Sequence, residues 1–194
     1  MTNAYFTDYL AKQQALYQAI PIATVTRWAA MLQQAWTDER QLFVFGNGGS
    51  AMNASHFVTD LGKSASDRMG KRFRCMCLNE SISWITALGN DYAYEDVYAG
   101  QLQNYARPGD LVLALSVSGS SPNVVKAVAW ANAHELTTLA LVGGSGGKLA
   151  EIATEHIRLP DTHFGRVEDA QMTICHLLCY CFIEGNDEGV MNGE

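Results

Sequence analysis

Four side chains that can ligate a metal or move a proton fall on two segments far apart in the chain. His56 and Asp60 are four residues apart in a helix-like segment, so they share one face of it. Glu168 and His176 are eight apart in a second helical segment, which separates their Cα atoms by about 12 Å along the axis. A histidine and a carboxylate so placed can bind a divalent metal or transfer protons.

Each pair also has a purely structural explanation. His56 and Asp60 fit a solvated pair on a helix, and His176 stands among apolar residues, as core histidines do. Glu168 in the first turns of a helix favours the positive end of the helix dipole. Glu168 and His176 are too far apart to chelate one ion by themselves, but they can flank a substrate together with groups from another subunit.

Two loops rich in glycine and serine have the chemistry of a phosphate cradle. Gly46-Asn-Gly-Gly-Ser50 separates an apolar strand from a helix, and Ser116-Val-Ser-Gly-Ser-Ser121 holds the same position further on. Glycines admit close backbone approach, and hydroxyls with a helix start bind phosphate without a lysine or arginine. The alternative is a plain tight turn and an N-cap serine. Neither loop matches a nucleotide-binding motif, so we expect no nucleotide cofactor.

Composition limits the classes of protein. Of 194 residues, 48% are hydrophobic and 17% are charged, which excludes intrinsic disorder. The net charge of −7 argues against a nucleic-acid binder. The sequence contains no run of about 18 apolar residues, so we expect no membrane-spanning helix. The N-terminus does not resemble a signal peptide. Five cysteines within apolar runs indicate buried thiols of a cytoplasmic protein: Cys75, Cys77, Cys175, Cys179 and Cys181.

Helical and strand patterns alternate through most of the chain. Strands are expected at 41–45, 73–78, 111–115, 138–142 and 156–159. Helices are expected at 7–20, 24–37, 50–61, 82–88, 94–105, 122–134, shortly after 147 and at 167–183, with a break at Gly89-Asn-Asp91. The alternation predicts an α/β fold with a five-stranded parallel sheet flanked by helices. We expect one domain over 1–194, made of a helical extension at 1–38 and a sheet core at 39–194.

The order of the motifs resembles that of sugar isomerase (SIS) domains. The matching residues are Gly46-Asn-Gly-Gly-Ser-Ala51, His56, Gly89-Asn-Asp91, Ser116-x-Ser-Gly119 and Gly146-Gly147. Nearly the whole chain, including the helical extension, most resembles the phosphoheptose isomerase family. The resemblance implies a flavodoxin-like three-layer fold and a cytoplasmic homo-oligomer, a tetramer, with no membrane or nucleic-acid partner.

The same resemblance implies roles for particular residues. Substrate-binding positions carried over from the family are Asn47, Gly48, Gly49, Ser50, Asn90, Asp91, Ser116, Ser118 and Ser121. The implied catalytic residues are Asp60, His176 and Glu168, and the implied zinc ligands are His56, Asp60, Glu168 and His176. The chain departs from the family's pattern: Asp60 replaces a glutamate, Glu168 a glutamine and Val117 a threonine. Lys63 is the basic residue nearest to the place of a family arginine, and Gly165 stands where the family has an acidic residue.

The implied reaction converts sedoheptulose 7-phosphate to D-glycero-D-manno-heptose 7-phosphate through an enediol, in heptose synthesis for a surface glycan. The changed carboxylates leave an isomerase of another phosphosugar open. A second alternative is a non-catalytic relative that binds the DNA replication initiator protein, although a scaffold has no need of the His, Asp and Glu set. A sugar-phosphate-sensing regulator would need a DNA-binding domain, for which the chain has no room.

Overall fold

A five-stranded parallel sheet forms the centre of residues 3–185, the part of the chain that the computed structural model describes. The strand order is β2-β1-β3-β4-β5, and every neighbouring pair is parallel. The strands are β1 (Leu42–Gly46), β2 (Cys75–Cys77), β3 (Leu111–Ser116), β4 (Thr137–Gly143) and β5 (Glu155–Leu159). The predicted sheet and fold class are confirmed.

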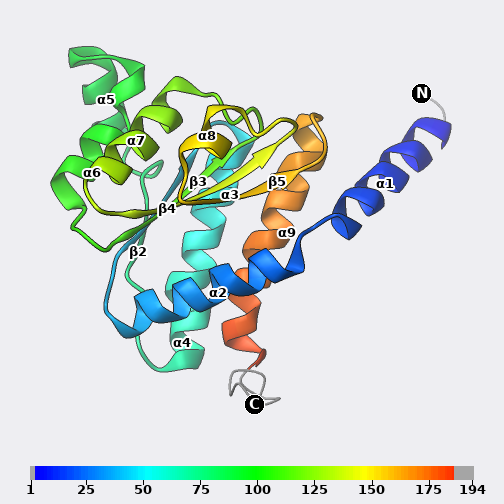
Figure 1. The fold of residues 1–194 in the computed structure, drawn as a ribbon, viewed down its shortest axis with the longest axis horizontal. Coiled ribbons are helices and arrows are strands. Elements are labelled where there is room, and N and C mark those ends of the chain that lie inside the picture. Colours follow the sequence, from blue (N-terminus) through cyan, green and yellow to red (C-terminus); the bar gives the residue numbers. More distant parts are fainter. Residues whose placement is uncertain (1–2, 186–194) are drawn as a thin grey trace.

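Helices cover both faces of the sheet (Figure 1). One face carries α1 (Asn3–Gln18), α2 (Ile22–Thr37), α3 (Gly49–Thr59), α4 (Ser66–Met69) and α9 (Phe164–Ile183). The other carries α5 (Ile82–Asp91), α6 (Ala99–Tyr105), α7 (Pro122–Ala133) and α8 (Gly147–Ile152). Successive strand residues point to opposite faces. Val44 and Leu113 therefore join the first apolar layer, while Phe43 and Val112 join the second.

The α1 helix projects from the body as an arm (Figure 1). Its buried residues are Gln13 and Leu16, and the Gln13 amide donates to the main-chain oxygen of Arg166 at 3.2 Å. Tyr5, Phe6 and Leu10 are more than half exposed. The arm thus carries apolar side chains that the described part of the chain does not cover.

Three sequence-based boundaries are wrong. The expected break at Gly89-Asn-Asp91 lies inside α5, because a glycine in a helix costs only about 1 kcal/mol and does not by itself end it. The expected helix at 94–105 is two elements, a 3₁₀ turn η2 (Tyr94–Asp96) and α6. The segment expected as one helix at 50–61 is α3 followed by a π-helical stretch, η1 (Asp60–Ala65).

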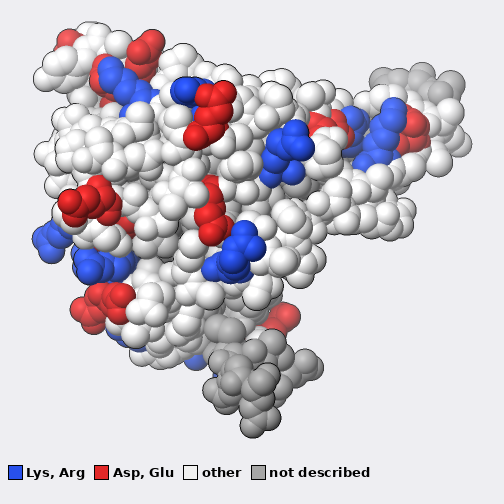
Figure 2. All heavy atoms as spheres, viewed as in Figure 1, with Lys and Arg blue, Asp and Glu red and all other residues white. Residues whose placement is uncertain are grey.

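Charged residues of both signs are interspersed on the face seen in Figure 2. Several are paired, such as Lys148 with Glu151 at 2.7 Å and Lys12 with Asp8 at 2.6 Å. On this face the described residues present no broad basic surface of the kind that binds a nucleic-acid backbone. Within residues 3–185, no helix is long and apolar enough to cross a membrane.

Candidate active site

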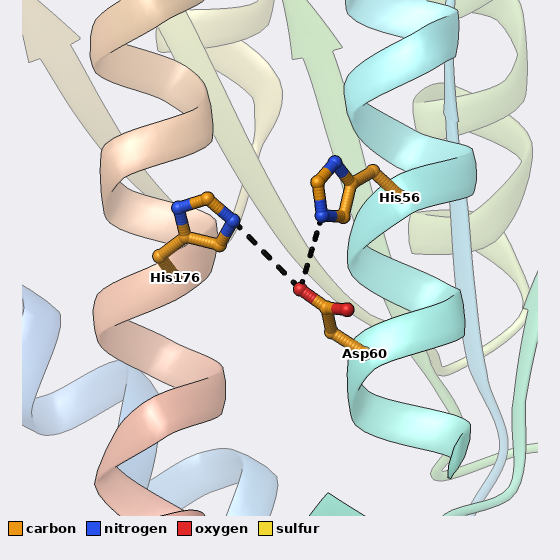
Figure 3. A group of neighbouring side chains, drawn as sticks. All are labelled: His56, Asp60 and His176. Atoms are coloured by element: carbon orange, nitrogen blue, oxygen red, sulfur yellow. Dashed lines mark ion pairs between the residues drawn. The ribbon is translucent and has the colours of Figure 1, made fainter. Parts of the chain in front are cut away.

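One carboxylate and two imidazoles meet between α3 and α9 (Figure 3). The Asp60 Oδ2 atom lies 3.2 Å from His56 Nε2 and 3.7 Å from His176 Nε2. The two imidazole ring centroids are 5.2 Å apart, with the ring planes at 75°. Three of the four side chains predicted to do chemistry are therefore brought together from distant parts of the sequence.

The local backbone places these groups at the rim of the first apolar layer. Asp60 begins the π-helical stretch that follows α3, a wider turn that is found often at functional sites. On α9, Ile174 and Cys175 are fully buried, while the side chain of His176 is 43% exposed. The apolar neighbours fix α9 against the core, and His176 is left facing the open side.

Nearby cysteines remain protonated. Burial raises the pKa of Cys179 to about 12, and the negative charge of Asp60 acts in the same direction. Burial also raises the pKa of Cys175, which is fully enclosed. Since a thiolate rather than a thiol is the metal ligand and nucleophile, the chemistry of this region is limited to the imidazoles and carboxylates.

The donor set of this cluster fits a divalent transition metal. One ligand atom from each of His56, Asp60 and His176 lies within 4.8 Å of the other two. Two imidazole nitrogens and one carboxylate oxygen, with a position left for water or substrate, are the donors of a catalytic zinc site. The His56 side chain is 52% exposed, so a substrate can reach the cluster from solvent.

Glu168, the fourth predicted ligand, lies outside this cluster. Its carboxylate accepts a hydrogen bond from the backbone N–H of Ser50, and a Cβ atom at Gly49 would clash with it. Burial raises the pKa of Glu168, while the bond from Ser50 acts in the opposite direction. Eight residues along α9 separate Glu168 from His176, so it reaches the glycine loop instead of the imidazoles.

The two glycine- and serine-rich loops follow β1 and β3, which are neighbours in the sheet. We call residues 46–50 the glycine loop and residues 116–121 the serine loop. In the glycine loop, the buried Ser50 hydroxyl donates to Gln171 Oε1 at 3.0 Å. In the serine loop, the Ser116 hydroxyl accepts from the N–H of Gly119 at 3.1 Å.

The remaining hydroxyls of the serine loop lie closer to solvent. Ser118 is exposed, and its hydroxyl accepts from the N–H of Ser120 at 3.2 Å. Ser121 precedes α7 as its N-cap without a side-chain bond to the helix. Val117, at the position where the resemblance implies a threonine, is buried in the first apolar layer.

Asn90 and Asp91 lie outside the imidazole cluster. Both are exposed near the end of α5, and Asn90 Nδ2 donates to Asp91 Oδ1 at 2.8 Å. The α5 helix packs on the second apolar layer, across the sheet from α9. Within a single chain, these two predicted substrate-binding residues therefore lie apart from the imidazole cluster.

Three polar residues at the loops were not predicted: Asn79, which is partly buried, and the buried Tyr98 and Asn123. For Asn79 and Asn123, the sequence position could have indicated a role at the loops. Asn79 directly follows a strand, where parallel sheets place ligand-facing residues, and Asn123 opens a helix behind the serine loop. Tyr98 gave no such indication, because an aromatic residue within a helical pattern is typical of the core.

Known proteins resemble the chain over most of its length. The SIS domain family matches residues 5–143. A phosphoheptose isomerase of Geotalea daltonii is 39% identical over 77% of each chain, and one of Laribacter hongkongensis is 33% identical over 91% of each. The solved phosphoheptose isomerase of Francisella tularensis superposes with a TM-score of 0.85 at 27% identity, covering 94% of this chain and 98% of that one.

Proposed function

Because the chain belongs to the phosphoheptose isomerase family of SIS-domain proteins, we propose that it interconverts sedoheptulose 7-phosphate and D-glycero-D-manno-heptose 7-phosphate. The observation that carries this proposal is the convergence of His56, Asp60 and His176 on one open face. Such an arrangement of proton-transfer groups suits an aldose–ketose isomerisation.

We propose that the serine loop binds the substrate phosphate. The hydroxyls of Ser118 and Ser121 offer donors to an anion, and the positive end of the α7 dipole, which begins at Pro122, favours negative charge there. The glycine loop offers a poorer phosphate site, because the carboxylate of Glu168 already accepts the N–H of Ser50 and would repel a second anion. The glycine loop then faces the sugar, through Asn47, Gly48 and Gly49.

The reaction needs one proton moved between adjacent carbons. A base removes a proton from C1 of the ketose, giving an enediol, and an acid returns a proton to C2 while the oxygens exchange one proton. We assign Asp60 and His176 as the acid–base pair, with His56 orienting Asp60 at 3.2 Å. Glu168, whose pKa is raised by burial, is the second carboxylate available for the transfer between oxygens.

We propose that His56, Asp60 and His176 hold zinc. When bound, the ion would act as a Lewis acid that stabilises negative charge on the sugar oxygens. If these three residues are all occupied as ligands, Glu168 is the carboxylate left free to act as the base. Burial raises the pKa of Glu168, which makes its carboxylate a stronger base for removing the proton.

We also propose that the active form is a cytoplasmic homo-oligomer, a tetramer. The exposed imidazoles of His56 and His176 need a cover that excludes water during the reaction. An apolar hollow of ≈ 470 Å³ also lies between α2 and α9, lined by residues including Val25, Ala29 and Leu177. A second copy would cover this face. The free thiols favour a reducing compartment.

The test is a coupled assay of the purified protein on sedoheptulose 7-phosphate, with metal content measured in parallel. Turnover that is lost on chelation and restored by zinc would support both the reaction and the ion. Absence of turnover with and without zinc would refute the substrate assignment. Capture of the replication initiator protein by a chain without turnover would favour the scaffold alternative.

A further inference from the structure

A reciprocal pair of amides ties the glycine loop to the serine loop. The Nδ2 atom of Asn47 donates to Asn123 Oδ1, and the Nδ2 atom of Asn123 donates to Asn47 Oδ1, each at 2.9 Å. Asn47 belongs to the glycine loop, whereas Asn123 lies in the first turn of α7, directly behind the serine loop. Asn123 is 2% exposed and also accepts from the N–H of Val124. Two hydrogen bonds therefore fix the separation of the two loops.

Tyr98 supports the same pair from the side of α6. Its hydroxyl lies 2.9 Å from Asn47 Oδ1 and also contacts the main-chain oxygen of Gly46. The ring stacks on Phe45 with centroids 4.8 Å apart, and the residue is 1% exposed. Burial raises the pKa of Tyr98, so the hydroxyl stays protonated. The Tyr98 hydroxyl can donate its proton to Asn47 Oδ1 or to Gly46 O. The stacking of the Tyr98 ring on Phe45 fixes the position of this hydroxyl.

Asn79 holds the other side of the glycine loop. Its Oδ1 atom accepts from the N–H of Gly46 at 3.2 Å, and its Nδ2 atom lies 2.8 Å from both Gly46 O and the Tyr98 hydroxyl. Gly46 is itself tightly enclosed, because a Cβ atom there would lie 2.6 Å from the main-chain oxygen of Leu115. The end of β1 is thus surrounded by groups that follow β2, precede α6 and open α7.

We infer that Asn79, Tyr98 and Asn123 are positioning residues that set the distance between the glycine loop and the serine loop. This rests on the proposed function, in which the two loops bind the two ends of one phosphosugar. Their side-chain hydrogen bonds described above go to the loops and to one another, not to the His56–Asp60–His176 cluster. Their loss should therefore weaken substrate binding more than it slows the chemical step.

Steady-state kinetics on sedoheptulose 7-phosphate separate these effects. Tyr98→Phe, which removes only the hydroxyl, should raise KM about tenfold and leave kcat within about twofold, because a small misplacement of a binding group is costly. Asn47→Ala and Asn123→Ala should each raise KM. The double variant should be no worse than the more damaged single variant, since the two amides act as one unit.

A matched control removes a buried hydroxyl elsewhere in the sheet. Thr138→Val deletes a fully buried hydroxyl that bonds Asn132 and Thr154 near the amino end of β4. This variant should lower the melting temperature without changing KM. Tyr98→Phe keeps the test decisive if Asn123→Ala fails to fold.

The outcomes distinguish this inference from the function on which it rests. No turnover by the wild-type chain would refute the proposed function and this inference with it. Turnover by the wild type with an unchanged KM in Tyr98→Phe would overturn the positioning role alone. A Tyr98→Phe variant that loses thermal stability as Thr138→Val does, with no change in KM, would overturn it as well.

Discussion

The imidazole cluster and the amide network at the loops are organised in opposite ways. Asp60 faces two half-exposed imidazoles across 3.2 and 3.7 Å, and all three side chains are of types that transfer protons or bind divalent metals. The network of Asn47, Asn123 and Tyr98 is neutral, with Asn123 and Tyr98 buried, Asn47 partly buried, and hydrogen bonds of 2.9 Å. The imidazole cluster leaves ligand atoms open to a metal or substrate, whereas the polar groups of the amide network form hydrogen bonds with one another within the chain.

This difference separates chemistry from positioning. A buried polar network whose members are all paired is rigid, and an unpaired member would be costly. An exposed cluster of ligating groups tolerates substitution without unfolding, but it cannot react without its substrate or metal. Substitutions in the cluster should therefore change activity, and substitutions at the enclosed end of β1 should change folding or binding.

The largest effect is expected from His176→Ala. Loss of a general acid–base group costs about 100- to 10,000-fold in rate, and the half-exposed side chain contributes little to the core. The coupled assay should show that fall in kcat with an unchanged melting temperature. His134→Ala is the matched control, since that exposed histidine stacks on Trp130 near the end of α7. Equal activity in both variants would contradict the role of His176.

Asp60→Asn should remove most of the metal affinity while it keeps the side-chain volume. Loss of an outer-shell partner alone lowers metal affinity about 10- to 100-fold, and Asp60 is a direct donor of the cluster. Zinc retained per chain after dialysis against a weak chelator is the measurement. Asp67→Asn, which changes an exposed carboxylate paired with Arg72, is the control. Zinc retention equal to wild type in Asp60→Asn would exclude the proposed site.

Two glycine substitutions contrast the enclosed strand end with an open helix. Gly46→Ala places a Cβ atom 2.6 Å from Leu115 O and 2.8 Å from Ser50 Cβ, so it should destabilise the chain by about 1–3 kcal/mol. Gly89→Ala meets nothing within 4 Å inside α5, so it should stabilise by about 0.5–1 kcal/mol. Urea unfolding measures both. A stabilising Gly46→Ala would contradict the described packing.

The smallest effect concerns the pH dependence of stability at Glu168. Burial raises the pKa of this carboxyl in the folded chain, so the folded state holds the proton more tightly than the unfolded state. Stability should fall as pH rises from the unfolded pKa through the folded one, and stay level above it. Glu168→Gln keeps an acceptor for the Ser50 N–H and removes the charge. The difference in unfolding free energy between Glu168→Gln and the wild type should shift in favour of the variant as pH rises from 3 to 8; a difference that does not change with pH would contradict the assignment.

Local patterns predicted much of the fold and part of the site. The apolar runs of β1, β3 and β4 and the spacing of His56 and Asp60 identified the sheet and one half of the cluster. The π-helical turn at Asp60 was missed, because a change in helical hydrogen bonding leaves no spacing signal. The position of Glu168 and the role of Tyr98 depend on how distant elements pack, which a sequence alone does not show.

The central claim is that the chain moves a proton between two carbons of a phosphosugar and that the reaction depends on His176. Incubation with sedoheptulose 7-phosphate in D₂O, followed by NMR, tests it most directly. One group removes the proton from C1 and a different group, which takes up a deuteron from D₂O before the substrate binds, protonates C2. The account therefore predicts an aldose heptose 7-phosphate that carries deuterium at C2. It also predicts neither product nor label with His176→Ala. An aldose product without deuterium, or labelling that is unaffected by His176→Ala, would contradict the account.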